Sequence, residues 1–219
     1  MKKILVIIII LLSSNVLAHM DHYKKYNKIE MEIFRNGELI GYNYYFFTRK
    51  GDETIVTNQI KFSVKILGAT IFQVEGYGEE KYLKDQLISY NSKTLQNDKE
   101  KFVNLVFDKD KNKYNIKGTS YSGEASINNI IGNWWCHKIL QTNSQISPIS
   151  GSIKKQVVTF VGKEKIEQYG KVYNADLFTL KSKDKRLDFD IWFDKKNFMI
   201  IRVSYSRMGN WEYRLKNFD

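Results

Sequence analysis

The chain has 219 residues, of which 42% are hydrophobic and 27% charged, with 13 Gly, 1 Pro and 1 Cys. This composition excludes collagen, low-complexity disorder and disulfide-stapled miniproteins. A folded chain of this length buries roughly 70% of its unfolded surface, so its core needs neither a metal nor a disulfide. The length fits one large domain or two small ones, and the sequence shows no Pro- or Ser-rich linker, which favours one domain.

The formal charge is +11, from 35 Lys and Arg against 24 Asp and Glu. Such a balance is found in proteins that bind nucleic acids or anionic membranes. The lysines, however, are scattered singly through the chain and do not cluster beside aromatic residues. We therefore expect a solvated lysine face and no nucleic-acid partner. A weak contact with an anionic membrane surface stays open.

The first 18 residues have the pattern of a secretory signal peptide. Lys2 and Lys3 form a basic start, 4–12 is an apolar run, and Val16-Leu17-Ala18 ends on a small residue. The apolar run is too short to span a membrane, and no later stretch approaches that length. No Cys follows Ala18 to carry a bacterial lipid anchor. The pattern predicts a periplasmic or secreted protein without a transmembrane span, with residues 19–219 as a single domain.

Alternating apolar residues are the main structural signal after residue 28. The pattern predicts antiparallel strands joined by short polar turns, with Asn36-Gly37 as a strong hairpin signal. The predicted strand segments are 29–33, 40–46, 60–66, 72–74, 82–89 with a bend at 84–85, 103–107, 114–116, 157–161 ending at Gly162, 178–180, 187–193, 199–205 and 211–215.

One segment, 125–140, breaks this alternation. Its apolar residues recur at helical spacing, and Ser126 is a suitable N-cap. We expect a mainly β fold: a curved antiparallel sheet of about eleven strands, forming an incomplete barrel around one short helical segment. A sheet of this many strands must curl or fold over, so a two-sheet sandwich is the competing architecture.

Several segments, in order along the chain, resemble an uncharacterised bacterial family of exported proteins known as a domain of unknown function. The matching segments are Asn36-Gly37-Glu38-Leu39-Ile40-Gly41, Glu80-Lys81-Tyr82 through Leu87 to Ser92-Lys93-Thr94, Asn133-Trp134-Trp135, Gln141-Thr142, Ser150-Gly151, Gly162-Lys163-Glu164, Trp192-Phe193-Asp194 and Gly209-Asn210-Trp211-Glu212-Tyr213. Cys136-His137 and Asn197 depart from the family pattern.

The resemblance implies a half-barrel related to that of the lipoprotein carriers LolA and LolB. It also implies a concave apolar face that holds a lipid or another hydrophobic molecule. The family has no established catalytic residues, so the resemblance assigns none here.

Cys136-His137 looks like a nucleophile beside a base. Neighbouring residues on a strand point to opposite faces, and on a helix they diverge by about 100°, so the two side chains cannot readily pair. We expect Cys136 to be a buried apolar residue and His137 to be packed or on the surface. Gly118-Thr119-Ser120-Tyr121-Ser122-Gly123 has one residue too many for a nucleophile elbow. We expect no enzymatic activity and no catalytic residues.

Metal sites and paired carboxylates are also not predicted. Asp108–Asn112 starts like a calcium loop, but Lys113 and Thr119 stand where Gly and Glu are required, which favours a solvated hairpin turn. Asp188 and Asp190 share one strand face and are expected to face water rather than to act as a glycosidase pair.

Cleavage after Ala18 would make His19 the first residue, with His22 three positions on. An amine and imidazole of this kind can bind copper, but a frayed chain end is the simpler expectation. We therefore predict no metal and no cofactor.

Four tryptophans carry the largest apolar surfaces. Core packing is the first interpretation, and the alternative is that they line a ligand cavity. The ligand-lining candidates are Trp134, Trp135, Trp192 and Trp211. Two functions follow: a non-enzymatic exported protein that binds a hydrophobic or lipid-like ligand, or an envelope structural protein with a filled core and a protein partner.

Overall fold

The computed structural model describes residues 19–184 and 186–219. Thirteen strands form one antiparallel sheet in the order β12-β13-β14-β15-β16-β1-β2-β3-β4-β5-β6-β7-β8, and β11-β10-β9 form a small second sheet. The strands of the large sheet are β1 (Lys28–Arg35), β2 (Glu38–Lys50), β3 (Glu53–Ile66), β4 (Ala69–Leu83), β5 (Gln86–Gln96), β6 (Lys99–Asp108), β7 (Lys113–Gly118), β8 (Ser122–Ser126), β12 (Val157–Gln168), β13 (Lys171–Lys181), β14 (Asp188–Asp194), β15 (Met199–Ser206) and β16 (Asn210–Phe218).

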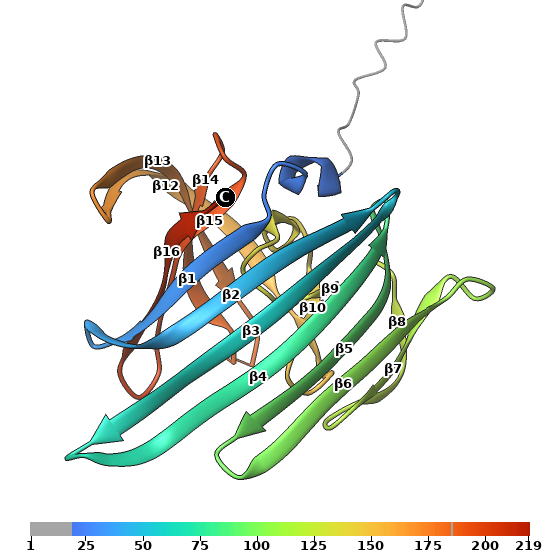
Figure 1. Ribbon diagram of the computed structural model, residues 1–219, viewed down its shortest axis with the longest axis horizontal. Coiled ribbons are helices and arrows are strands. Elements are labelled where there is room, and N and C mark those ends of the chain that lie inside the picture. The colour runs from blue at the N-terminus through green and yellow to red at the C-terminus, as the bar shows by residue number, and fades with distance from the viewer. Residues whose placement is uncertain (1–18, 185) are drawn as a thin grey trace, which may run out of the picture.

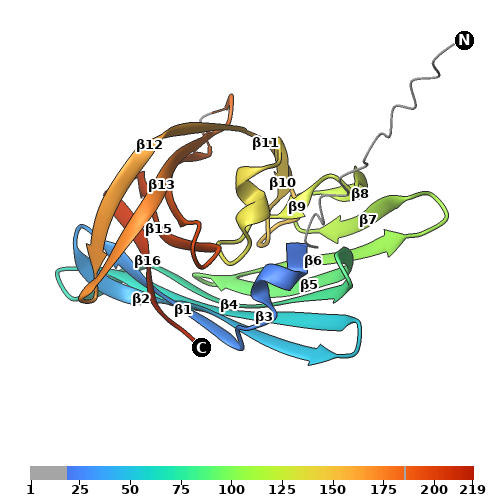
Figure 2. The same ribbon diagram turned by 90° about the horizontal axis from the view of Figure 1, so that it is seen from above.

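The large sheet curls into a trough and does not close into a barrel. Seen from above, β12 and β13 arch over one side while β2 to β6 form the floor (Figure 2). β1 lies between β16 and β2, so the first and last strands pair in the middle of the sheet. The predicted mainly β class and curved antiparallel sheet are confirmed. The sheet is larger than predicted because β8, which is too short and too polar to show alternation, also pairs at its edge.

No α-helix occupies the trough in the described part of the chain, which corrects the helix expected over 125–140. Ala125 and Ser126 end β8, and a loop with β9 (Ile130–Ile131) follows. Within 125–140, only η2 (His137–Leu140), a short 3-10 helix, has helical backbone. The helical spacing of the apolar residues did not indicate a helix, because Ile131, Trp135 and Ile139 reach the core from an irregular, partly extended backbone. Tertiary packing overrides local periodicity in such segments.

The segment that follows completes a plug inside the trough. β10 (Ser144–Ile146) pairs with β9 in parallel and with β11 (Ile153–Lys155) antiparallel. This segment, yellow in Figure 2, lies in the hollow of the curled sheet. We call residues 127–156 the plug.

Two strand details differ from the prediction. The segment 82–89 is not one bent strand, because Lys84 adopts a left-handed turn conformation (φ 53) that joins β4 to β5. β12 continues past Gly162, where a bulge keeps the pairing with β13. On β2, Tyr45 faces the core, while Tyr44 lies on the partly exposed face.

The two ends of the trough differ. Residues His19–Tyr23 form a 3-10 helix, η1, that packs at the end where β2 meets β3 and β4 meets β5 (Figure 1). We call this the capped end. His19, Met20 and Tyr23 are buried there, so the expectation of a frayed terminus is wrong. The turns β1–β2, β3–β4, β5–β6 and β15–β16 lie at the opposite end, because alternate turns of an antiparallel sheet share an end.

The predicted signal peptide, residues 1–18, lies outside the described residues. Among residues 19–184 and 186–219, no helix has the length and apolarity needed to cross a membrane.

Candidate functional site

A cavity of about 280 Å³ lies between the plug and the concave face of the sheet. Aromatic and aliphatic side chains form most of its wall, and amides, hydroxyls and one carboxyl face it from the sheet. Its principal lining residues are Asn43, Tyr45, Asn58, Ile60, Glu80, Tyr90, Ser92, Thr94, Ile131, Asn133, Trp134, Leu187, Phe189 and Tyr213. A concave, mainly apolar space with a few polar groups is typical of small-molecule sites.

Small residues on β4 help to shape this space. Gly76 and Gly78 both line the cavity. A Cβ at Gly78 would lie 3.0 Å from the Tyr90 hydroxyl, and one at Gly76 would lie 3.0 Å from Thr94 Oγ1. The absence of side chains at these two positions therefore lets Tyr90 and Thr94 lie over the strand.

A buried carboxyl group, that of Glu80, borders the cavity. Its Oε1 accepts hydrogen bonds from Trp135 Nε1 (2.9 Å) and from the side-chain amide of Asn133. Its Oε2 accepts one from the Tyr82 hydroxyl (2.6 Å). Burial raises the pKa of Glu80 to about 7, since three hydrogen bonds do not replace the lost hydration. The group joins the plug to the sheet floor.

Further polar contacts hold the plug over the cavity. The Tyr45 hydroxyl accepts hydrogen bonds from Asn43 Nδ2 (2.8 Å) and from the backbone N–H of Trp134 (3.1 Å). Tyr90 and Ser92 both donate their hydroxyl protons to the carbonyl of Pro148, at 3.0 and 2.7 Å. These bonds fix the plug at a set height above the sheet, so the space beneath it is defined.

An outer groove of about 540 Å³ adjoins the cavity. Trp134, Phe189 and Tyr213 line both spaces. The rings of Trp134 and Phe189 meet edge to face with centroids 5.1 Å apart. Asp184, Arg186, Asp188 and Arg207 line only the groove, so it places charged groups of both signs outside an aromatic wall.

The four predicted tryptophans lie in four different environments. Trp134 lines the cavity and the groove. Trp135 is fully buried in the core and bonds to Glu80. Trp211 is buried against Tyr205 and Phe62, outside the cavity lining. Trp192 lies on the outer face, where its Nε1 donates to Glu164 (2.7 Å).

Cys136 and His137 do not contact each other as a pair. His137 Nδ1 bonds to the Tyr23 hydroxyl (2.8 Å), while Cys136 Sγ lies 3.1 Å from His19 Nε2. Burial raises the pKa of the Cys136 thiol far above its ordinary value. Burial lowers the pKa of His19 to about 2 and that of His137 to about 4. A protonated thiol among neutral imidazoles is a packing cluster, not an activated nucleophile.

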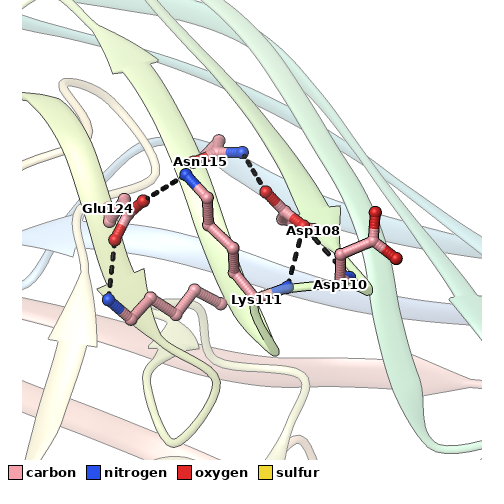
Figure 3. A network of polar contacts seen from close by, with 6 residues as sticks. Asp108, Asp110, Lys111, Asn115 and Glu124 are labelled. Carbon is pink, nitrogen blue, oxygen red and sulfur yellow. Dashed lines mark hydrogen bonds and ion pairs between the residues drawn. The ribbon is translucent and has the colours of Figure 1, made fainter.

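Asp108 caps its own hairpin turn (Figure 3). Its Oδ1 accepts from the backbone N–H groups of Asp110 and Lys111, both at 3.1 Å, and its Oδ2 accepts from Asn115 Nδ2 (3.2 Å). The Lys111 ammonium pairs with Glu124, whose pKa the neighbouring lysines lower to about 2. The solvated turn predicted from the failed calcium pattern is what the structure has.

The two remaining candidate carboxylates also lie on the surface. Asp188 and Asp190 are exposed on β14, as predicted, because the alternating residues of that strand face the core. Across the described ranges, no group of three or more His, Cys, Asp or Glu side chains is arranged to hold a metal ion.

The family described as "Domain of unknown function (DUF6134)" matches residues 31–216. The chain belongs to this family. Three of the segments singled out in the sequence meet around the cavity: Glu80 and Ser92 come from one, Asn133 and Trp134 from another, and Tyr213 from the last. In this DUF6134 chain, residues far apart in the sequence therefore line one site.

One solved structure has a similar fold. A beta-barrel-like protein of DUF1849 from Brucella abortus is 8% identical, covers 88% of this chain and 95% of its own, and has a TM-score of 0.58. A DUF1329 family protein from Desulfovibrio piger is 9% identical, with coverages of 91% and 88% and a TM-score of 0.31. No curated protein matches this DUF6134 chain.

Two cavity features went unpredicted. Glu80 appeared in the sequence only as a family residue beside Tyr82, and its burial follows from the inward phase of β4. Phe189 appeared only as a core residue of an alternating strand. Its place beside Trp134 depends on how the plug enters the trough, which no local signal in a sequence encodes.

Proposed function

We propose that this protein is exported and binds a hydrophobic or lipid-like molecule in the cavity beneath the plug, without chemistry. The observation that carries the proposal is the cavity of about 280 Å³ walled by Trp134, Phe189 and Tyr213 and continued by a groove. The space suits an apolar chain inside, with a polar end in the groove near Arg186 and Arg207. The relation to the LolA and LolB carriers belongs to the same proposal.

A non-catalytic role fits the buried titratable groups of the protein. Glu80, which lines the cavity, is engaged by three donors, and Cys136, which lies outside the cavity beside His19, is held as a thiol by burial. Export rests on the leader pattern of residues 1–18 and on the suitability of Ala18 as a cleavage position.

The end of the trough opposite η1 carries unusual turn residues. Leu67 and Met208 each occupy a left-handed turn position, with φ of 50° and 54°. Asn or Gly is favoured there, and a large apolar side chain is strained. Leu67 is nevertheless fully exposed and Met208 is 86% exposed. Such strain without burial points to a partner outside the molecule.

The two turns belong to one continuous surface. Arg35 donates to the carbonyl of Met208 at 2.5 Å, and a groove lined by Arg35, Glu38 and Lys65 links the β1–β2 turn to β3. We call Leu39, Ile66, Leu67, Ile71 and Met208, all exposed, the apolar end.

The apolar end is proposed to enter an anionic lipid surface. Arg35, Lys65 and Arg207 flank its apolar tips, and Arg207 also lines the outer groove. A lipid-like ligand would then reach the groove directly from the membrane. Shallow apolar insertion combined with basic residues is how peripheral proteins bind such surfaces.

Fluorescence titration with 1-N-phenylnaphthylamine tests the cavity. We expect saturable binding that weakens roughly tenfold in Leu187→Trp, because Leu187 lines the cavity and the larger ring takes up part of its volume. Trp192→Ala, on the outer face, is the matched control and should bind as the wild type does. Equal affinity in Leu187→Trp, or no saturable binding at all, would contradict the proposal.

A protein partner is the second candidate, and the free edge of the sheet favours it. β12 ends the strand order, and its Val157, Phe160 and Val161 are exposed. An edge strand with apolar side chains can accept a strand from another chain. Crosslinking in cells through a photoreactive residue at Val161 should then recover one protein. Recovery of none would count against this candidate.

A further inference from the structure

Asp85 lies at the capped end of the trough, in the turn between β4 and β5, and is half-buried. Its Oδ2 accepts a hydrogen bond from the backbone nitrogen of His19 (3.1 Å). Its Oδ1 accepts one from the backbone nitrogen of Met20 (2.8 Å). Both carboxylate oxygens are therefore turned toward the start of η1.

Among the described residues, the Asp85 carboxylate has no cationic partner. The two nearby lysines pair elsewhere, Lys24 with Asp21 and Lys84 with Asp52. Within residues 19–184 and 186–219, no ion pair joins a side chain to Asp85. A half-buried carboxylate held by two amide N–H groups would gain most from a positive charge at one of those nitrogens.

We propose that Asp85 is the binding site for the α-amino group that cleavage before His19 creates, and that the processed N-terminus docks there to close the capped end. The inference rests on the proposed export. Hydrolysis of the Ala18–His19 peptide bond adds water, leaving a carboxylate on Ala18 and an amine on His19. That amine takes up a proton below about pH 8. The protonated amine then donates to Asp85 Oδ2 as an ammonium, whereas the uncleaved chain donates there as an amide N–H.

The His19 side chain holds the amine in this position. Its ring is buried against Tyr23 (centroids 5.5 Å apart) and His137 (5.1 Å), and its Nε2 lies 3.1 Å from Cys136 Sγ. Burial keeps this imidazole neutral, so the terminal charge resides on the amine alone. Met20 is buried beside it. A chain that begins one or two residues earlier would keep the ring in place but lose the charge at Asp85.

Four chains test the docking: one that begins at His19, one with Gly-Ser before His19, and Asp85→Asn in each. We expect the thermal midpoint of the chain beginning at His19 to exceed that of the extended chain by roughly 2–4 °C. Asp85→Asn should lower the midpoint of both chains, because the Asn amide replaces one of the two acceptor oxygens, but it should lower that of the chain beginning at His19 by more and so remove its advantage. If the decreases in thermal midpoint caused by the Gly-Ser extension and by Asp85→Asn simply add, the docking is overturned. Equal midpoints for the two starts would overturn it as well.

Two further measurements separate docking from export. Acylation of the α-amino group at neutral pH should be slower in the chain beginning at His19 than in its Asp85→Asn variant, and equal rates would contradict the docking. The intact mass of protein exported from the full-length chain should correspond to a start at His19. A different start would overturn the proposed cleavage, while the four-chain comparison would still decide the docking.

Discussion

Glu80 and Trp135 are joined by a 2.9 Å hydrogen bond from the indole nitrogen to the carboxyl oxygen, across 55 residues of chain. The bond connects the floor of the trough to the plug. Both side chains are buried, Trp135 completely. The contact therefore determines where the plug lies, and through it the height of the cavity beside Trp134.

Stability should depend on pH through Glu80. Burial raises its pKa from 4.5 to about 7, so between these values the folded chain binds more protons than the unfolded chain. The contribution of this group to stability is therefore largest below pH 4.5 and falls as the pH rises toward 7, by about 3 kcal/mol.

Glu80→Gln removes that titration. The difference in free energy of unfolding between this variant and the wild type should shift by about 3 kcal/mol in favour of the variant between pH 4.5 and pH 8. Urea unfolding at the two pH values measures it. Glu79→Gln, on the opposite face of β4, is the control and should show no comparable shift. A pH-independent difference for Glu80→Gln would show that the carboxyl is hydrated.

Substitution of the two turn residues of the apolar end should stabilise the fold but weaken membrane binding. Leu67→Asn and Met208→Asn place a residue suited to left-handed turns at each tip, so each should stabilise the fold by about 1 kcal/mol. The double variant should nevertheless bind anionic phospholipid vesicles several-fold more weakly in a sedimentation assay.

The control for this experiment lies at the capped end. Lys84→Asn also changes an exposed left-handed turn residue, but at the opposite end of the sheet. It should retain the vesicle binding that the double variant loses. If both weaken binding equally, charge rather than apolar insertion governs the contact with lipid.

Gly41 should be intolerant of any side chain. A Cβ there would lie 2.1 Å from the carbonyl oxygen of Lys61 and 2.4 Å from the Cβ of Phe62. Gly41→Ala forces β2 away from β3 and should cost at least about 1–3 kcal/mol in urea unfolding. Gly162 has no atom within 4 Å of such a Cβ, so Gly162→Ala should be close to neutral. Similar losses at both positions would contradict this packing.

Cys136 should be inert in the folded protein. It is buried and its thiol pKa is raised, so iodoacetamide at pH 8 should not react with the native chain. Addition of denaturant should make the thiol reactive, with a midpoint that follows unfolding. Rapid labelling of the native protein would mean that η1 opens readily over this cluster.

The outline of the fold could be predicted because strands with one buried face reveal themselves by alternation. β14 to β16 follow this pattern closely, with Ile191, Val203 and Tyr213 buried. β2 shows the limit of the method. Its tyrosines and phenylalanines occupy both faces, so local alternation does not show that Tyr45 rather than Tyr44 is buried.

The site was harder to predict than the sheet. Trp134 was one of four equal candidates, and nothing local distinguishes it from Trp192 on the outer face. The helix predicted in the plug is wrong because the spacing of its apolar residues reflects their contacts with the surrounding sheet and not a helical backbone. His19 was expected to fray, because its partners Asp85 and Cys136 lie 66 and 117 residues away.

Native mass spectrometry of the protein purified from membrane-containing cells tests the central claim most directly. The wild-type spectrum should contain a second species heavier by the mass of one apolar or lipid molecule, and organic extraction should release that molecule. Leu187→Trp, in which the larger ring takes up part of the cavity, should lack the heavier species. A wild-type protein that carries nothing, or a Leu187→Trp variant that carries the same adduct, would contradict a ligand beneath the plug.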